Sequence, residues 1–144
     1  MDTDDLRPAA RSLALLARKL ERACGPLSLA QFRVLSLVAA GDERSSLVAE
    51  RLAVAKPTVT AVVDGLVERG LLVREAIEGN RRSIRLCITS DGQAAVVDAE
   101  TVMADALADV FEGVTDRAAL LRGLTELHDT WIARVDARLG AIKQ

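Results

Sequence analysis

Residues 47–72 read LVAERLAVAKPTVTAVVDGLVERGLL, and the spacing of their apolar side chains decides the fold. Leu47–Leu52 is predicted to form a short helix that the Ser45-Ser46 pair caps. A second helix begins near Pro57, which suits a first helical position, and ends at Gly70. Its core-facing residues are Val59, Val62, Val63, Leu66 and Val67. Two short helices joined by a turn of three or four residues are typical of a helix-turn-helix.

The sequence that follows predicts a two-stranded hairpin. Leu71–Glu75 and Ser83–Thr89 are the predicted strands. In the second strand Ile84, Leu86 and Ile88 alternate with polar residues, which places these three on one face. Glu78–Arg82 is predicted to form a polar, basic tip between the strands.

Two helices are predicted before this unit. The first carries apolar residues at spacings of three and four, has Pro8 in its opening turn and ends at Gly25-Pro26. Its apolar face consists of Leu6, Ala9, Leu13, Leu16, Ala17, Leu20 and Cys24. Ser28 and Gln31 have the spacing of a capping box, which starts a second helix that runs to about Ala40. That helix is expected to bury Phe32, Leu35, Val38 and Ala39.

Two long helices are predicted after the hairpin. Ser90 and Gln93 repeat the capping-box spacing and open a helix that runs to about Glu112. Thr115-Asp116 is expected to cap the last helix, whose apolar stripe has nearly heptad spacing. The stripe consists of Leu120, Leu124, Leu127, Trp131, Val135, Leu139 and Ile142. Such a ridge would promote aggregation if it were exposed. We therefore expect it to pack on the first helix, on the fifth helix, which opens at Ser90, and on a second subunit.

Charge and composition exclude several protein classes. Residues 44–90 contain eight Lys and Arg against five Asp and Glu, whereas residues 91–144 have a net charge of −5. A basic middle third suits a polyanion such as DNA. With one His and two distant Cys, the 144 residues offer no disulfide framework and no ordinary zinc site. We expect no enzyme, no cofactor and no metal, and the acidic N-terminus with short apolar runs predicts a soluble, cytoplasmic protein.

The order of these elements resembles the MarR family (multiple antibiotic resistance regulators). The likeness rests on Leu47–Leu52, Lys56–Leu72, Asn80-Arg81-Arg82 and Leu86–Gly92. It implies a homodimer with intertwined terminal helices that binds pseudo-palindromic DNA and represses transcription until a small molecule or an oxidant disturbs it. The expected fold is mainly α with a small β-hairpin wing: a winged helix-turn-helix with long N- and C-terminal dimerisation helices. Expected regions are 1–30 and 91–144 for dimerisation and 31–90 for DNA binding.

A recognition helix reads the major groove from its N-terminal turns, where free N–H groups also favour phosphate. Lys56, Pro57, Thr58 and Thr60 are therefore candidates for DNA contact, and Ala61 can meet a thymine methyl group. At the wing the candidates are Asn80, Arg81 and Arg82, because narrow minor grooves attract guanidinium groups. Ser45 and Arg74 are candidates for phosphate contact. Asp64 is expected to pair with a nearby Arg, since phosphates would repel it.

The remaining candidates concern dimerisation and sensing. Dimer contacts are expected from Leu6 and Leu13 together with Leu120, Leu124, Leu127, Trp131, Val135 and Leu139. Cys24 is a candidate redox sensor, although buried and inert cysteines are common. His128 and Trp131 either line a pocket for a small organic ligand or pack at the dimer interface.

One alternative remains open for the whole chain. Ala55 lacks a capping side chain, Ala61 and Gly65 stand where the family often has Arg, and Asn80 replaces the family's Asp. These departures suit a winged-helix protein-interaction module whose DNA binding is weak or lost.

Overall fold

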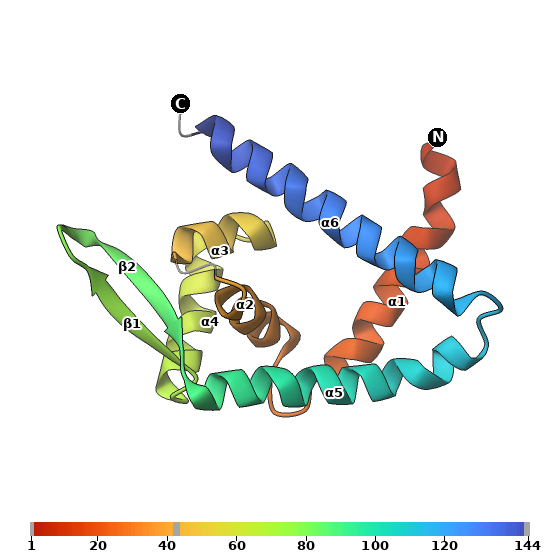
Figure 1. Cartoon of the computed structure of the whole chain (residues 1–144), viewed down its shortest axis with the longest axis horizontal. Helices are drawn as coiled ribbons and strands as arrows, with labels where there is room; N and C mark the ends of the chain where they lie inside the picture. Colours follow the sequence, from red (N-terminus) through yellow and green to blue (C-terminus); the bar gives the residue numbers. More distant parts are fainter. Residues whose placement is uncertain (1, 42–43, 143–144) are drawn as a thin grey trace.

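The computed structural model describes residues 2–41 and 44–142, and of residues 80–83 and 142 only the backbone. The elements are η1 Thr3–Leu6, α1 Arg7–Ala23, α2 Leu29–Ala39, α3 Ser45–Leu52, α4 Lys56–Glu68, β1 Leu72–Ile77, β2 Asn80–Ile88, α5 Ser90–Glu112 and α6 Arg117–Ile142. Figure 1 shows α2, α3, α4 and the hairpin at one end of the molecule and α1 at the other, with α5 running beneath both. From the far end of α5, α6 returns above α1 toward α3. The predicted mainly α fold with a hairpin wing is confirmed.

The hydrophobic core joins the three-helix cluster to the base of the hairpin and to α5. Its fully buried side chains include Val34 and Leu35 of α2, Val48 of α3, Val63 and Leu66 of α4, and Leu72 and Leu86 of the strands. From α5, Val96, Ala99 and Met103 complete this core. Each fully buried Val or Leu contributes about 1.5–3 kcal/mol of transfer free energy, so these contacts hold the helix-turn-helix on α5.

Two helix starts confirm the predicted capping, and a third corrects it. Ser28 Oγ accepts from Gln31 N at 3.1 Å, and Ser28 N donates to Gln31 Oε1 at 3.0 Å, as a capping box requires. Ala119 N donates to Asp116 Oδ1 at 2.9 Å at the start of α6. The box predicted at Ser90 and Gln93 is wrong by one residue, because the extended residue before α5 is Thr89.

Thr89 also joins three elements. Its Oγ1 accepts from Gly92 N at 3.0 Å and donates to Gly70 O at 2.7 Å, and its N–H donates to Leu71 O at 3.2 Å. These bonds tie the end of β2 and the start of α5 to the segment that follows α4.

The cap predicted for α3 is also wrong. The helix begins at Ser45 itself, its N-cap residue is Arg44, and the Arg44 side chain makes no capping hydrogen bond. Arg44 forms an isolated antiparallel bridge with Arg85 of β2. Main-chain pairing with the hairpin, rather than a serine hydroxyl, therefore positions this helix start.

In α2 the buried face differs slightly from the prediction. Val34, Leu35 and Val38 are buried, while Phe32 is half-buried and Ala39 is exposed. Ala39 is the last residue of the helix, where the chain turns away from the core at Gly41.

The wing is longer than predicted. β1 and β2 pair antiparallel with Leu72 opposite Ile88, and Glu78-Gly79 forms the turn, with Gly79 at φ +82°. The predicted tip Glu78–Arg82 is therefore corrected, because Asn80, Arg81 and Arg82 belong to β2. Ile84 is 47% exposed although Leu86 on the same face is buried. Only the base of the hairpin meets the core, and its far end projects away from it (Figure 1).

Candidate nucleic-acid interface

The recognition helix α4 has one buried face and one exposed face. Val59, Val63 and Leu66 enter the core. The predicted contact residues of its first two turns, Lys56, Pro57, Thr58, Thr60 and Ala61, are all exposed. The structure therefore brings these five candidates together at one end of one helix, where they are accessible to a large ligand.

The start of α4 favours an anion. Its N-cap residue, Ala55, makes no side-chain bond, as the sequence predicts, and Pro57 lies in the first turn. The positive end of the helix dipole and the Lys56 ammonium thus act at the same place. Thr60 Oγ1 donates to Lys56 O at 3.0 Å, so this hydroxyl retains its acceptor capacity, whereas no hydrogen bond holds the exposed Thr58 side chain among the described residues.

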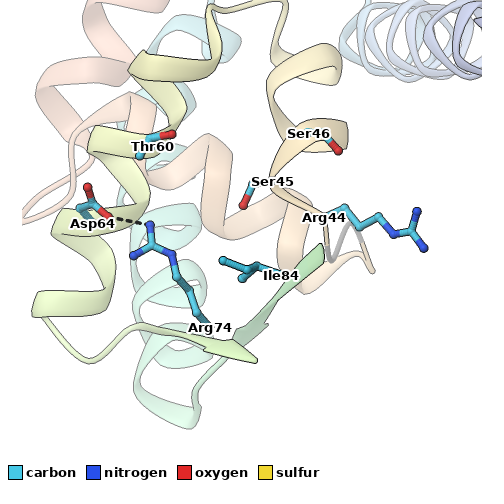
Figure 2. A pocket seen from close by; sticks show the side chains of 7 residues that line it. All are labelled: Arg44, Ser45, Ser46, Thr60, Asp64, Arg74 and Ile84. Carbon is cyan, nitrogen blue, oxygen red and sulfur yellow. Dashed lines mark hydrogen bonds and ion pairs between the residues drawn. The ribbon is translucent and has the colours of Figure 1, made fainter. Parts of the chain in front are cut away.

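A groove of about 550 Å³ lies between α4, the start of α3 and the hairpin. Its walls are formed by Arg44, Ser45, Ser46, Thr60, Asp64, Arg74 and Ile84. Figure 2 shows Ser45 and Ile84 directed into the groove and the Arg44 side chain extending away from its centre. The predicted phosphate candidates Ser45 and Arg74 therefore face one another across a polar groove next to the recognition helix.

An ion pair crosses this groove. Arg74 Nη2 of β1 lies 2.6 Å from Asp64 Oδ1 of α4 (Figure 2). The prediction that Asp64 pairs with a nearby Arg is confirmed. The pair balances the carboxylate that faces the groove and links the recognition helix to the wing. Arg74 keeps guanidinium donors for a second acceptor, because five N–H groups are available and the pair uses one.

The wing contributes the remaining cationic residues. Asn80, Arg81 and Arg82 form the first three residues of β2, and their side chains lie outside the described part. Nearer the core, Arg85 Nη2 contacts Glu75 Oε2 of the opposite strand at 3.3 Å. The sequence prediction missed Arg44, which lines the groove and pairs with Arg85 through the main chain. Arg44 is the first residue of the net basic stretch 44–90, and this position was the signal that could have identified it.

A second, apolar cleft of about 440 Å³ lies between α1, α2 and α5. Leu20, Phe32, Met103 and Leu107 contribute to its walls. Two charged residues also line it: Arg33 from α2 and Glu100 from α5. Such a combination of apolar walls and a few charged groups suits a small organic molecule.

Cys24 lies in the core and does not have the environment of a redox sensor. Its side chain is fully buried, with Sγ 3.4 Å from Met103 Sδ. Burial, with the nearby Glu21 carboxylate, raises the pKa of the thiol despite the opposing Arg33 charge. A reactive cysteine needs an accessible thiolate, so the prediction of redox sensing at Cys24 is not supported by this geometry. Cys87 is half-buried on β2.

The predicted dimerisation residues divide into two groups. Leu6, Leu13, Leu120, Leu124, Leu127 and Trp131 are exposed on the single chain. Val135 is 6% exposed and Leu139 is half-buried. In the single chain the N-terminal part of the α6 stripe is exposed, and α6 makes its most extensive contact with α3. The expected packing of the stripe on the first helix, the fifth helix and a second subunit stays a prediction. Leu15 and Leu121 are further exposed leucines that the prediction omitted.

Within residues 2–41 and 44–142, His, Cys, Asp and Glu do not gather in groups of three that could hold a metal ion. His128 is exposed on α6 beside the exposed Trp131. No described helix is long and apolar enough to cross a membrane.

Comparison with known proteins identifies this architecture. A sequence model of the MarR family matches residues 26–83, from the loop before α2 into β2. The chain is 25% identical to CouR from Rhodococcus jostii RHA1, solved with p-coumaroyl-CoA, with a TM-score of 0.69 over 88% of this chain and 87% of CouR.

Two further structures share the fold. A MarR-family transcriptional regulator from Rhodococcus sp. RHA1 is 24% identical, with a TM-score of 0.74 over 94% of this chain and 95% of the other. BpsR from Bordetella bronchiseptica, whose DNA binding is regulated by 6-hydroxynicotinic acid, is 22% identical, with a TM-score of 0.68 over 89% of this chain and 94% of BpsR. Residues 26–83 thus match the MarR family, and the chain has the winged helix-turn-helix fold of that family's DNA-binding transcriptional regulators.

Proposed function

We propose that this regulator is a homodimer that binds pseudo-palindromic operators and represses transcription until a small organic effector releases it. The observation that carries the proposal is the exposed N-terminal end of α4 beside a polar groove and a basic wing. A convex helix end flanked by cationic residues fits the major groove, while the wing reaches the adjacent minor groove.

The contacts we propose divide by their chemistry. Lys56 and Thr58 reach base edges and nearby phosphates, and Ala61 meets a thymine methyl group. Ser45 and Arg74 bind phosphate from the groove, which sets the orientation of the recognition helix without reading sequence. Asn80, Arg81 and Arg82 contact the minor groove and its backbone from the wing.

The dimer is supported by apolar surface that a single chain leaves uncovered. Leu120, Leu124, Leu127 and Trp131 are exposed along α6, and Leu6 and Leu13 are exposed near the start of the chain. A ridge of this size on a monomer would promote aggregation. A two-fold partner that buries it also supplies the second recognition helix that a pseudo-palindrome requires.

The effector site we propose is the cleft between α1, α2 and α5. Its apolar walls suit an aromatic ring, and Arg33 suits the carboxylate or another anionic group of the same ligand. The ligands of the structural relatives, p-coumaroyl-CoA and 6-hydroxynicotinic acid, support an aromatic acid or its thioester. Because α2 packs on both α4 and α5, a ligand in this cleft can shift the recognition helix relative to the dimer.

Fluorescence anisotropy with the promoter next to the protein's own gene, and with other pseudo-palindromic duplexes, tests the proposal. We expect salt-sensitive binding, with log K falling by about 0.9 per neutralised phosphate per unit of log salt concentration. Lys56→Ala and Arg82→Ala should both lose affinity. Asp105→Asn, at an exposed position of α5, serves as the control. Absence of binding to all these duplexes, with retention of a protein partner by both Ala variants, would establish the interaction module instead.

A further inference from the structure

The longest helix, α6, is held to its own chain at its two ends. It follows the 113–116 turn after α5, and its 26 residues correspond to about 39 Å. Leu120, Leu124 and Leu127, in its N-terminal half, are exposed on the single chain. Beyond the 113–116 turn, the main contact between α6 and the rest of the described chain therefore lies in the C-terminal third of α6.

That second attachment is to α3. Arg51 Nη2 lies 2.8 Å from Asp136 Oδ1, and the Arg51 side chain is only 22% exposed. The neighbouring Val135 is the most buried apolar residue of α6, and α3 is the element with which α6 makes its most extensive contact. We call these residues, Arg51, Val135 and Asp136, the α3–α6 contact.

The α3–α6 contact acts on the element that carries the recognition helix. α3 packs against α4, and the two are joined by the short turn 53–55, in which Ala53 adopts a left-handed conformation. An ordered α3 therefore transmits the direction of α6 to α4. The N-terminal half of α6, in turn, carries the apolar stripe to which the proposed function assigns the dimer.

We propose that Arg51 and Asp136 are positioning residues that set the distance between the two recognition helices of the dimer, and hence the operator spacing that the protein accepts. This inference rests on the proposed DNA-binding dimer. The 20 residues between Asp116 and Asp136 span about 30 Å, so a swing of about 10° at the 113–116 turn displaces the far end by about 5 Å. Because consecutive base pairs are about 3.4 Å apart, such a swing corresponds to one or two base pairs.

The test measures affinity against a series of operators whose half-sites are moved apart or together by one and two base pairs. The wild-type protein should prefer one spacing sharply. Asp136→Asn should lose about fivefold in affinity at that spacing, a typical size for coupling between sites, and lose little at the others, so that the preference flattens. Thermal unfolding and sedimentation should show the same fold and dimer for both proteins.

Two variants separate positioning from general destabilisation. Asp109→Asn removes a different tertiary ion pair, the 3.2 Å contact with Lys19 between α1 and α5, and should leave the spacing profile unchanged. The charge exchange Arg51→Asp with Asp136→Arg should restore part of the preference that each single change removes.

The outcomes are distinct. If Asp136→Asn flattens the dependence of affinity on half-site spacing, and the charge exchange between Arg51 and Asp136 restores it, the inference is supported. A sharp wild-type profile that Asp136→Asn leaves unchanged overturns it while the proposed function stands. A wild-type protein that binds none of the duplexes overturns the proposed function and the inference together.

Discussion

Gly92, in the first turn of α5, allows the base of the wing and α5 to meet. It is buried, and a Cβ built on it would overlap the carbonyl oxygen of Leu71 and lie 2.8 Å from Ile88 Cγ1. The carbonyl of Leu71 already accepts the Thr89 N–H, so a methyl group must push aside main chain that is part of the junction. Gly92→Ala should therefore destabilise the protein although Ala is the better helix former.

The size of the effect follows from three contributions. Overpacking a fitted site costs about 1–3 kcal/mol, and weakening the Thr89 hydrogen bond adds about 1 kcal/mol. The gain from replacing a helical Gly is about 1 kcal/mol, which leaves a net loss of about 2 kcal/mol. For a chain of this size, that corresponds to a melting temperature lower by about 6 °C.

Gly65→Ala provides the matched control. Gly65 also lies within a helix, but the nearest atom to its added Cβ is Gln31 Nε2 at an ordinary 3.8 Å. This variant should gain about 0.5–1 kcal/mol. Urea titrations of both variants at one fixed protein concentration give the comparison, because the stability of the proposed dimer would depend on concentration. Equal stabilities of the two variants, or a Gly92→Ala protein more stable than wild type, would refute the packing argument.

Three further predictions concern charged and titratable groups. Arg74→Ala should weaken operator binding more than the double variant Arg74→Ala with Asp64→Ala, because the single change leaves an unpaired carboxylate facing the phosphates; anisotropy of both proteins would contradict this if the double variant bound more weakly. The hydrogen bond from Lys19 lowers the pKa of Asp109 below its ordinary value of 3.8. The ionised Asp109 therefore stabilises the fold fully above pH 3.8, and this contribution is lost as the pH falls through the lowered pKa of the folded state. The stability difference between wild type and Asp109→Asn, followed by urea unfolding, should accordingly shrink in acid, and a difference that stays constant would be inconsistent with the ion pair. In a Cys87→Ser protein, Cys24 should react with Ellman's reagent only slowly until urea exposes it, because burial raises its pKa and covers its sulfur; rapid labelling of the native protein would restore Cys24 as a sensor.

Local spacing was sufficient to predict the helix-turn-helix. The buried positions Val59, Val63 and Leu66 follow the 3.6-residue period of a helix, and Ser28 and Gln31 form a capping box whose partners are three residues apart. The Asp64–Arg74 pair was predictable for a different reason, since a carboxylate on a DNA-facing helix needs a counter-charge.

Tertiary geometry decided the features that the prediction missed. The α5 cap moved from Ser90 to Thr89 because the Thr89 hydroxyl also bonds Gly70 O, 19 residues earlier. The contact between Arg51 and Asp136 joins residues 85 apart, and nothing local to either residue signals it. Alternation placed Ile84 and Leu86 on one face of β2, but periodicity cannot tell where a hairpin leaves the core, and Ile84 is 47% exposed.

The most direct test of the central claim, that paired α4 helices read duplex DNA, is a hydroxyl-radical footprint on the operator. The account predicts two symmetric protected patches centred one or two helical turns apart, about 34 Å per turn, and their loss in Lys56→Ala with Thr58→Ala. A single protected patch, or two patches that this double variant leaves intact, would contradict it.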